Sequence, residues 1–215
     1  MQMLRLQDQV HAAPVDDDLV FLDIRADRYL CLLGQAAAYD VNTRLLRLSD
    51  PAEASDLMSA GLCAPSGGQA LADQRPRPPT PTLTARRLTY PNPGLTDLAD
   101  AGVAWLDLTA HYRGRRLPQI LAAVRPSGVE PHPSGRLYEL VDSFHRWIPY
   151  APVSGKCLLR AFMLLRFLRR HGCDALWVFG VATWPFRAHC WLQVEDVVLD
   201  DDVERVRAYT PIFAQ

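Results

Sequence analysis

A proline-rich stretch near residue 75 limits the possible folds of this sequence more than any other feature. Pro65-Ser-Gly-Gly68 is followed by Arg75-Pro-Arg-Pro-Pro-Thr-Pro81. Proline has no backbone N–H and a restricted φ, so such a stretch continues neither a helix nor an internal strand. We therefore predict two folded domains, residues 1–75 and 83–215, joined by a proline-rich linker at 76–82.

The first domain has sequence signals for a β-hairpin and two helices. Residues 19–23 and 28–32 are short β-prone runs separated by four residues, which indicates a hairpin. Apolar residues at steps of three and four predict a helix over 36–48. Asp50-Pro51 is typical of a cap and first turn, and predicts a second helix over 52–60. Together these elements predict a small winged-helix-like module.

The second domain is predicted to contain helices followed by a sheet. Its apolar patterns predict helices at 95–108, 117–124, 135–145 and 157–171, and strands at 175–183, 187–195 and 197–199. The order favours a helix packed on an antiparallel sheet. The fold class expected for the whole chain is therefore α+β.

Composition argues against several function classes. The 23 basic and 24 acidic residues nearly cancel, so no charge excess favours nucleic acid or a membrane surface as a partner. The first thirty residues hold no long apolar run, so we expect neither a signal peptide nor a spanning helix, and a cytoplasmic protein. Five cysteines without C-x-x-C spacing, and histidines without ligand spacing, predict no disulfide framework, no metal site and no cofactor.

Cys157 is a candidate nucleophile because of its position. It begins the most apolar predicted helix, directly after Ser154-Gly155-Lys156. Backbone N–H groups and the helix dipole at a first turn lower the pKa of a thiol toward reactivity. The competing interpretation is a buried cysteine that acts as a small apolar side chain.

His189 is the candidate base, because a return strand brings carboxylates toward it. A predicted turn at 195–196 leads back to three aspartates at 200–202, and one of them can orient the imidazole. Spacing alone does not choose among the three, and the other two are interpreted as a solvated strand end. By strand alternation Cys190 faces away from His189 and is predicted to pack rather than react.

Several motifs resemble the leader peptidase, or B protein, of lasso-peptide biosynthesis, which joins a leader-recognition element to a transglutaminase-like, papain-related cysteine peptidase. The matching segments are the hairpin at 18–32, Cys157-Leu-Leu-Arg-Ala-Phe-Met-Leu-Leu-Arg166, Phe179-Gly-Val181, Ala188-His-Cys-Trp191 and Val198-Leu-Asp-Asp201. The resemblance implies that Cys157 is the nucleophile, His189 the base and Asp201 the orienting acid. The family commonly has His-Ala-Trp where this chain has His189-Cys-Trp191.

The resemblance also implies a substrate and a partner. The substrate would be a ribosomally made precursor peptide, whose leader is removed. An ATP-dependent cyclase resembling asparagine synthetase would then close the freed core peptide. We expect the leader to add as a strand to the edge at 28–32. Candidate peptide-binding residues are Tyr29, Leu30, Leu32, Trp184 and Phe186.

Two alternatives use the same residues. A Cys-His-Asp unit also performs acyl transfer through a thioester, as in transglutaminases and arylamine acetyltransferases. A protein without activity could instead bind the precursor and present it to the cyclase.

Overall fold

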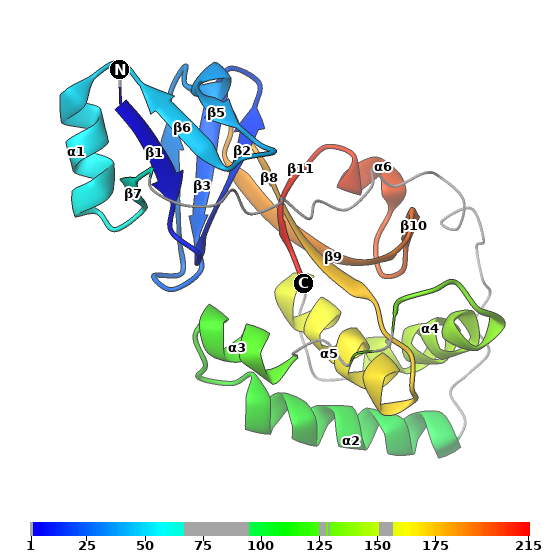
Figure 1. Ribbon diagram of the computed structural model, residues 1–215. Coiled ribbons are helices and arrows are strands. Elements are labelled where there is room, and N and C mark those ends of the chain that lie inside the picture. Colours follow the sequence, from blue (N-terminus) through cyan, green and yellow to red (C-terminus); the bar gives the residue numbers. More distant parts are fainter. Residues whose placement is uncertain (1, 67–94, 125–127, 129, 151–156) are drawn as a thin grey trace. The chain divides into compact units, whose positions relative to one another are not determined.

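The computed structural model describes residues 2–66, 95–124, 128, 130–150 and 157–215 (Figure 1). The linker predicted at 76–82, and the residues 154–156 that precede Cys157, lie outside the described residues. Within the described part of the chain, no helix is both long and apolar enough to span a membrane.

The chain divides into two compact units. The first unit is formed by Met1–Arg75 together with Gly180–Ala188 and Thr210–Ala214, and the second by Pro76–Phe179, His189–Tyr209 and Gln215. Two strands, β8 (Leu176–Ala182) and β9 (Arg187–Val194), therefore contribute residues to both units.

The first unit contains two sheets. One has the order β5-β6-β1-β7 and the other the order β2-β3-β4, and their strands pair antiparallel. The strands are β1 (Gln2–Leu6), β2 (Val10–Val15), β3 (Asp18–Asp23), β4 (Arg28–Leu32), β5 (Tyr39–Asp40), β6 (Leu45–Leu48) and β7 (Cys63–Pro65). The predicted hairpin is confirmed, since β3 pairs with β4 in a register that places Leu22 opposite Tyr29.

The helix predicted over 36–48 is wrong. This segment holds a 3-10 turn, η1 (Ala36–Ala38), and then the hairpin of β5 and β6. Short polar side chains favour the turn over a helix, because the Asp40 carboxylate accepts a hydrogen bond from the backbone N–H of Asn42 at 3.0 Å. The apolar side chains of Leu46 and Leu48, two residues apart, both enter the core.

The second predicted helix of this unit is confirmed as α1 (Pro51–Ser59). The Asp50 carboxylate accepts a hydrogen bond from the Ala52 N–H at 2.8 Å, and Gly61 has φ +71° just after the helix. With one α-helix and seven strands before residue 67, the described part of this unit is richer in strand than the predicted winged-helix-like module.

Two segments from the C-terminal part of the chain complete the first unit. Strand β11 (Thr210–Ala214) packs against β2, where the rings of His11 and Phe213 lie 4.5 Å apart between centroids. In the turn between β8 and β9, the Trp184 indole N–H donates to the Asp18 carboxylate at 2.8 Å. Neither contact was predicted, because each joins residues more than 160 positions apart in the chain.

The second unit contains the predicted helices. They are α2 (Leu95–His111), α3 (Leu117–Ala123), α4 (Gly135–Trp147) and α5 (Cys157–Arg170). A 3-10 turn that was not predicted, η2 (Ile148–Tyr150), follows α4. Helices α2, α4 and α5 pack against one another (Figure 1). The fold as a whole is a mixed α/β fold with antiparallel sheets, as the α+β prediction required.

Helix α5 is the central helix of this unit. Its side chains from Ala161 to Leu165 are all buried, so the helix is covered on more than one face. Phe162 contacts Trp177 of β8, with ring centroids 6.4 Å apart. Burial of these side chains holds α5 in place within the unit.

The remaining sheet has the order β10-β9-β8-β11, with β10 at Val197–Val198. The predicted turn between β9 and β10 is present, with Glu195 at φ 51°. A short helix, α6 (Val203–Val206), and strand β11 follow the aspartates and were not predicted.

Candidate active site

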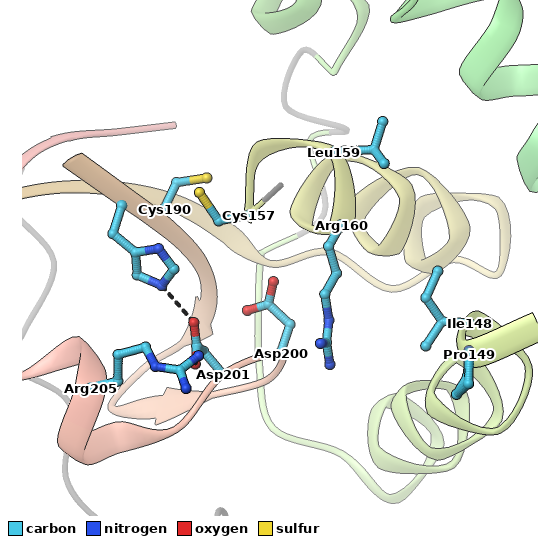
Figure 2. A pocket seen from close by; sticks show the side chains of 10 residues that line it. Ile148, Pro149, Cys157, Leu159, Arg160, Cys190, Asp200, Asp201 and Arg205 are labelled. Atoms are coloured by element: carbon cyan, nitrogen blue, oxygen red, sulfur yellow. Dashed lines mark hydrogen bonds and ion pairs between the residues drawn. The ribbon is translucent and has the colours of Figure 1, made fainter. Parts of the chain in front are cut away.

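Cys157 is the first residue of α5 and is partly buried. Its sulfur hydrogen-bonds to the side chains of Cys190 and His189, and it accepts a further hydrogen bond from the backbone N–H of Cys190. These partners come from β9 (Figure 2). The fold thus brings together residues that lie more than thirty positions apart in the sequence.

His189 and Asp201 form the closest polar contact of the site. The Nε2 atom of His189 lies 2.5 Å from Oδ2 of Asp201, and both side chains are 12% exposed. Because Nε2 is engaged with the carboxylate, Nδ1 is the ring nitrogen left for the Cys157 sulfur. The order of contact is therefore thiol, imidazole, carboxylate.

The second oxygen of Asp201 is also held. Oδ1 accepts hydrogen bonds from the backbone N–H of Asp202 at 2.7 Å and from the guanidinium of Arg205 at 3.0 Å. Rotation of the carboxylate would break these bonds. Asp201 is therefore the one of the three aspartates that the fold directs at the imidazole.

The other two aspartates have structural contacts. Asp200 is buried and accepts a hydrogen bond from the Leu192 N–H at 2.8 Å, and burial raises its pKa to about 7. The expectation that it belongs to a solvated strand end is wrong. Asp202 caps α6 by accepting from the Glu204 N–H at 2.8 Å.

The hydrogen bonds shift the pKa values of the thiol and the imidazole in opposite directions. The bonds from Cys190 and then His189 lower the pKa of Cys157 to about 4. The bond to Asp201, followed by the bond to Cys157, raises the pKa of His189 to about 9. At neutral pH the two side chains therefore form a thiolate and an imidazolium.

The carboxylate remains charged in the same range. Burial alone would raise the pKa of Asp201, but the hydrogen bonds from His189 and the Asp202 N–H lower it below its ordinary value. A negative charge next to the ring stabilises the imidazolium. Such an arrangement supports attack by the sulfur and proton transfer by the ring.

Cys190 does not merely pack, which corrects the sequence-based interpretation. Its thiol contacts Cys157, and that contact raises the pKa of Cys190 well above its ordinary value. Alternation separates Cys190 from His189 across the faces of β9, but it does not exclude a partner at the strand edge. The Cys157 sulfur accepts the Cys190 N–H, which places it at that edge and within reach of both side chains.

Cys157, His189 and Asp201 line a pocket of about 320 Å³ (Figure 2). Ile148, Pro149 and Leu159 supply apolar lining, and Arg160 and Arg205 supply positive charge. A pocket with both kinds of lining can hold a ligand beside the reactive sulfur.

His145 supports this pocket from α4. Its Nε2 hydrogen-bonds to the carbonyl oxygen of Leu199 at 3.2 Å, while Arg160 donates to its Nδ1 at 3.0 Å. Burial, followed by the charge of Arg160, lowers the pKa of His145 to about 4, so the ring is neutral. The imidazole therefore links α4 to Leu199, the residue before Asp200, by a hydrogen bond.

Sequence reasoning missed Cys190, Arg205 and His145 as parts of the site. For Arg205 a signal existed, since it follows Asp201 by four residues, the spacing of an ion pair on one helix face. No spacing rule connects His145 with Leu199, because their contact spans 54 residues.

A second pocket, of about 140 Å³, lies within the first unit. Tyr29, Leu30 and Cys31 of β4 line one side, and Thr183, Trp184 and Phe186 line the other. Four of the five residues predicted to bind peptide therefore lie together. The fifth, Leu32, packs partly buried against the core of the first unit.

Among the described residues, no group of three or more His, Cys, Asp or Glu side chains is arranged to hold a metal ion. The Cys157, His189 and Asp201 side chains instead bond to one another.

The sequence matches the model of a known protein family. The family described as the Transglutaminase-like superfamily matches residues 103–214, slightly more than half of the chain. The matched range includes Cys157, His189 and Asp201. No curated protein and no solved structure matches the chain.

Proposed function

Because the chain belongs to the transglutaminase-like superfamily, whose members are often cysteine-dependent enzymes, we propose that it is a cysteine peptidase. The observation that carries this proposal is the thiolate–imidazolium pair of Cys157 and His189, with Asp201 bonded to the far ring nitrogen. In such a pair the thiolate is already formed before the substrate binds, so it can attack directly.

The proposed reaction has two halves. The Cys157 thiolate attacks the carbonyl carbon of the scissile bond, and the His189 imidazolium gives its proton to the leaving amine as the C–N bond breaks. The product is a thioester on Cys157. Neutral His189 then takes a proton from water, which attacks the thioester and releases the acid and the thiolate.

The proposed substrate is the leader region of a ribosomally made lasso-peptide precursor. Strand β4 is the last strand of its sheet, and an extended peptide can pair with the backbone of such an edge. The adjacent pocket of Tyr29, Leu30, Trp184 and Phe186 is apolar and suits side chains of that peptide. Backbone pairing would provide affinity, and the pocket would provide selectivity.

The proposed partner is an ATP-dependent cyclase that resembles asparagine synthetase. Hydrolysis releases the new N-terminal amine of the core peptide, which is the group that such a cyclase would join to a side-chain carboxylate. The proposed site of the reaction is the cytoplasm, where a ribosomally made precursor and ATP are both present. The support for this partner is the sequence resemblance of the motifs around Cys157 and His189.

The test compares Cys157→Ala with the unmodified protein on a lasso-peptide precursor that carries its leader. The variant should bind the peptide with unchanged affinity and leave it uncut, because only the nucleophile is missing. Cys173→Ala is the matched control, since Cys173 lies after the other end of α5. Cleavage by Cys157→Ala at the normal rate would rule out the peptidase assignment.

Acyl transfer uses the same thioester and is the second candidate, favoured by the superfamily itself. Adding a primary amine to the reaction separates the two. A free acid in the mass spectrum supports hydrolysis, and an amide adduct supports transfer. A protein that binds the peptide but yields neither product would be a presenting adaptor.

A further inference from the structure

Two thiols meet in the pocket, although the proposed reaction needs only one. Cys157 comes from α5 and Cys190 from β9, and Figure 2 shows their sulfurs turned toward each other. The side chains share a hydrogen bond. Both cysteines are free thiols in the structure.

The two sulfurs differ in access and in charge. Both cysteines line the pocket, but Cys157 is partly exposed, whereas Cys190 is only 3% exposed. An oxidant that enters the pocket reaches Cys157 first. The thiolate is also the form of cysteine that oxidants attack, so the first oxidation falls on Cys157.

We propose that Cys157 and Cys190 are a redox modification site, at which a hydroperoxide converts the thiol pair into a disulfide and a small dithiol restores it. The proposal goes beyond the peptidase function and requires only that Cys157 is a reactive thiol. It assigns a covalent role to Cys190, whose thiol otherwise hydrogen-bonds to Cys157 and lowers its pKa.

The reaction balances in two steps. In the first, the Cys157 sulfur attacks one peroxide oxygen, the O–O bond breaks, and the departing hydroxide takes the His189 proton and leaves as water. In the second, the Cys190 sulfur attacks the sulfenic sulfur of Cys157. The S–O bond breaks and the hydroxyl leaves with the Cys190 proton as a second water, so two electrons and two protons have passed to the peroxide.

The contact between the sulfurs favours the second step after the first has occurred. In the reduced state, the hydrogen bond to the Cys157 thiolate holds Cys190 in its protonated form. Conversion of the thiolate to a neutral sulfenic acid removes that negative charge. Cys190 then loses its proton more easily, and its sulfur already lies beside the atom that it attacks.

The disulfide would have two effects. It removes the nucleophile, so the site becomes inactive while the oxidant is present. It also prevents further oxidation of Cys157 to the sulfinic acid, which small thiols do not reverse. The buried Cys190 is itself shielded from the oxidant.

The experiment treats the full chain with hydrogen peroxide and reads the thiols directly. The expected product has lost about 2 Da, the mass of two hydrogen atoms. Peptide mapping after blocking of free thiols should find the Cys157 and Cys190 peptides joined. Dithiothreitol should restore the alkylation of Cys157 by iodoacetamide.

Variants sharpen the test. In Cys190→Ala and Cys190→Ser, the same treatment should oxidise Cys157 to the sulfinic acid, and dithiothreitol should not restore its alkylation. Cys173→Ala should behave as the unmodified protein. If the unmodified protein loses Cys157 reactivity irreversibly, or if mapping joins another pair, the proposal is overturned. The mapping needs no variant to fold and no peptide to be cleaved, so failure of the peptidase assignment would be seen separately.

Discussion

The imidazole of His189 is held between two charged groups, with its Nε2 atom 2.5 Å from Oδ2 of Asp201 and its other edge bonded to the Cys157 sulfur. The ring of Tyr209 lies 5.1 Å from it between centroids and limits its rotation. Because one ring bonds both partners, a change at Asp201 should be measurable at Cys157.

The reactivity of Cys157 should depend on pH with two limits. Its alkylation by iodoacetamide should rise through about pH 4, where the thiol loses its proton, and stay level until about pH 9. Above that pH, His189 loses its proton and can no longer act as the acid, so peptide cleavage should fall. The pH profile of cleavage should therefore be bell-shaped, with its two limbs near pH 4 and pH 9.

Cys31 provides an internal control for this measurement. It is exposed, and burial followed by the charge of Asp18 raises its pKa above the ordinary value. Its alkylation should rise only at alkaline pH. If the rates at Cys31 and Cys157 rise together with pH, no thiolate–imidazolium pair exists.

Asp201→Asn should lower kcat/KM by about 100-fold or more, because an amide cannot stabilise the imidazolium or fix its tautomer. The pKa of His189, which Asp201 raises, should fall toward its ordinary value of 6.5. The alkaline limb of the pH profile should move down with it. Histidine NMR signals followed through a pH titration would measure this directly.

Asp202→Asn is the matched control for this variant. Asparagine caps a helix as well as aspartate does, so α6 should keep its first turn. Activity within about twofold of the unmodified protein is expected. Equal losses of activity in Asp201→Asn and Asp202→Asn would mean that the effect comes from a change in the segment between β10 and α6 and not from the contact with His189.

Arg205→Gln should lower kcat/KM slightly, and the difference from the unmodified protein should shrink as salt is added. The Arg205 side chain is 65% exposed, and a pair of that kind is worth about 0.2–1 kcal/mol, or up to about fivefold in rate. The loss in kcat/KM should shrink above about 0.5 M salt, where exposed charges are screened. Arg207→Gln, whose partner is Glu204, should show no such loss.

Phe186→Ala should weaken peptide binding without changing the chemical step. Its ring lies 5.3 Å from that of Tyr29 and forms part of the apolar pocket of the first unit. Loss of an aromatic anchor should raise the Kd about 10-fold, with kcat at saturating peptide unchanged. Isothermal titration with the Cys157→Ala background would measure the affinity alone.

Leu106→Ala is the control for this experiment. Leu106 is an exposed apolar side chain of α2 that does not line the pocket. The Kd of Leu106→Ala for the peptide should match that of the unmodified chain. An unchanged Kd for Phe186→Ala would exclude the pocket as a peptide-binding surface.

Local sequence signals determined much of the second unit and part of the first. The apolar run after Cys157 predicted α5, the Asp50-Pro51 pair predicted α1, and the turn at 195–196 predicted the return toward Asp201. Each of these depends on neighbours in the sequence: a period, a cap or a turn. The same approach gave a wrong prediction for residues 36–48, because their apolar spacing fits a hairpin as well as a helix.

The choice of Asp201 and the position of Cys190 were decided only by the tertiary structure. Three adjacent aspartates look alike in the sequence, and hydrogen bonds from Leu192, His189 and Glu204 give each of them a different environment. The thiol of Cys190 meets Cys157 because α5 packs its first turn at the edge of β9. Such contacts depend on how distant segments pack, and packing is a property of the assembled core rather than of any short stretch of sequence.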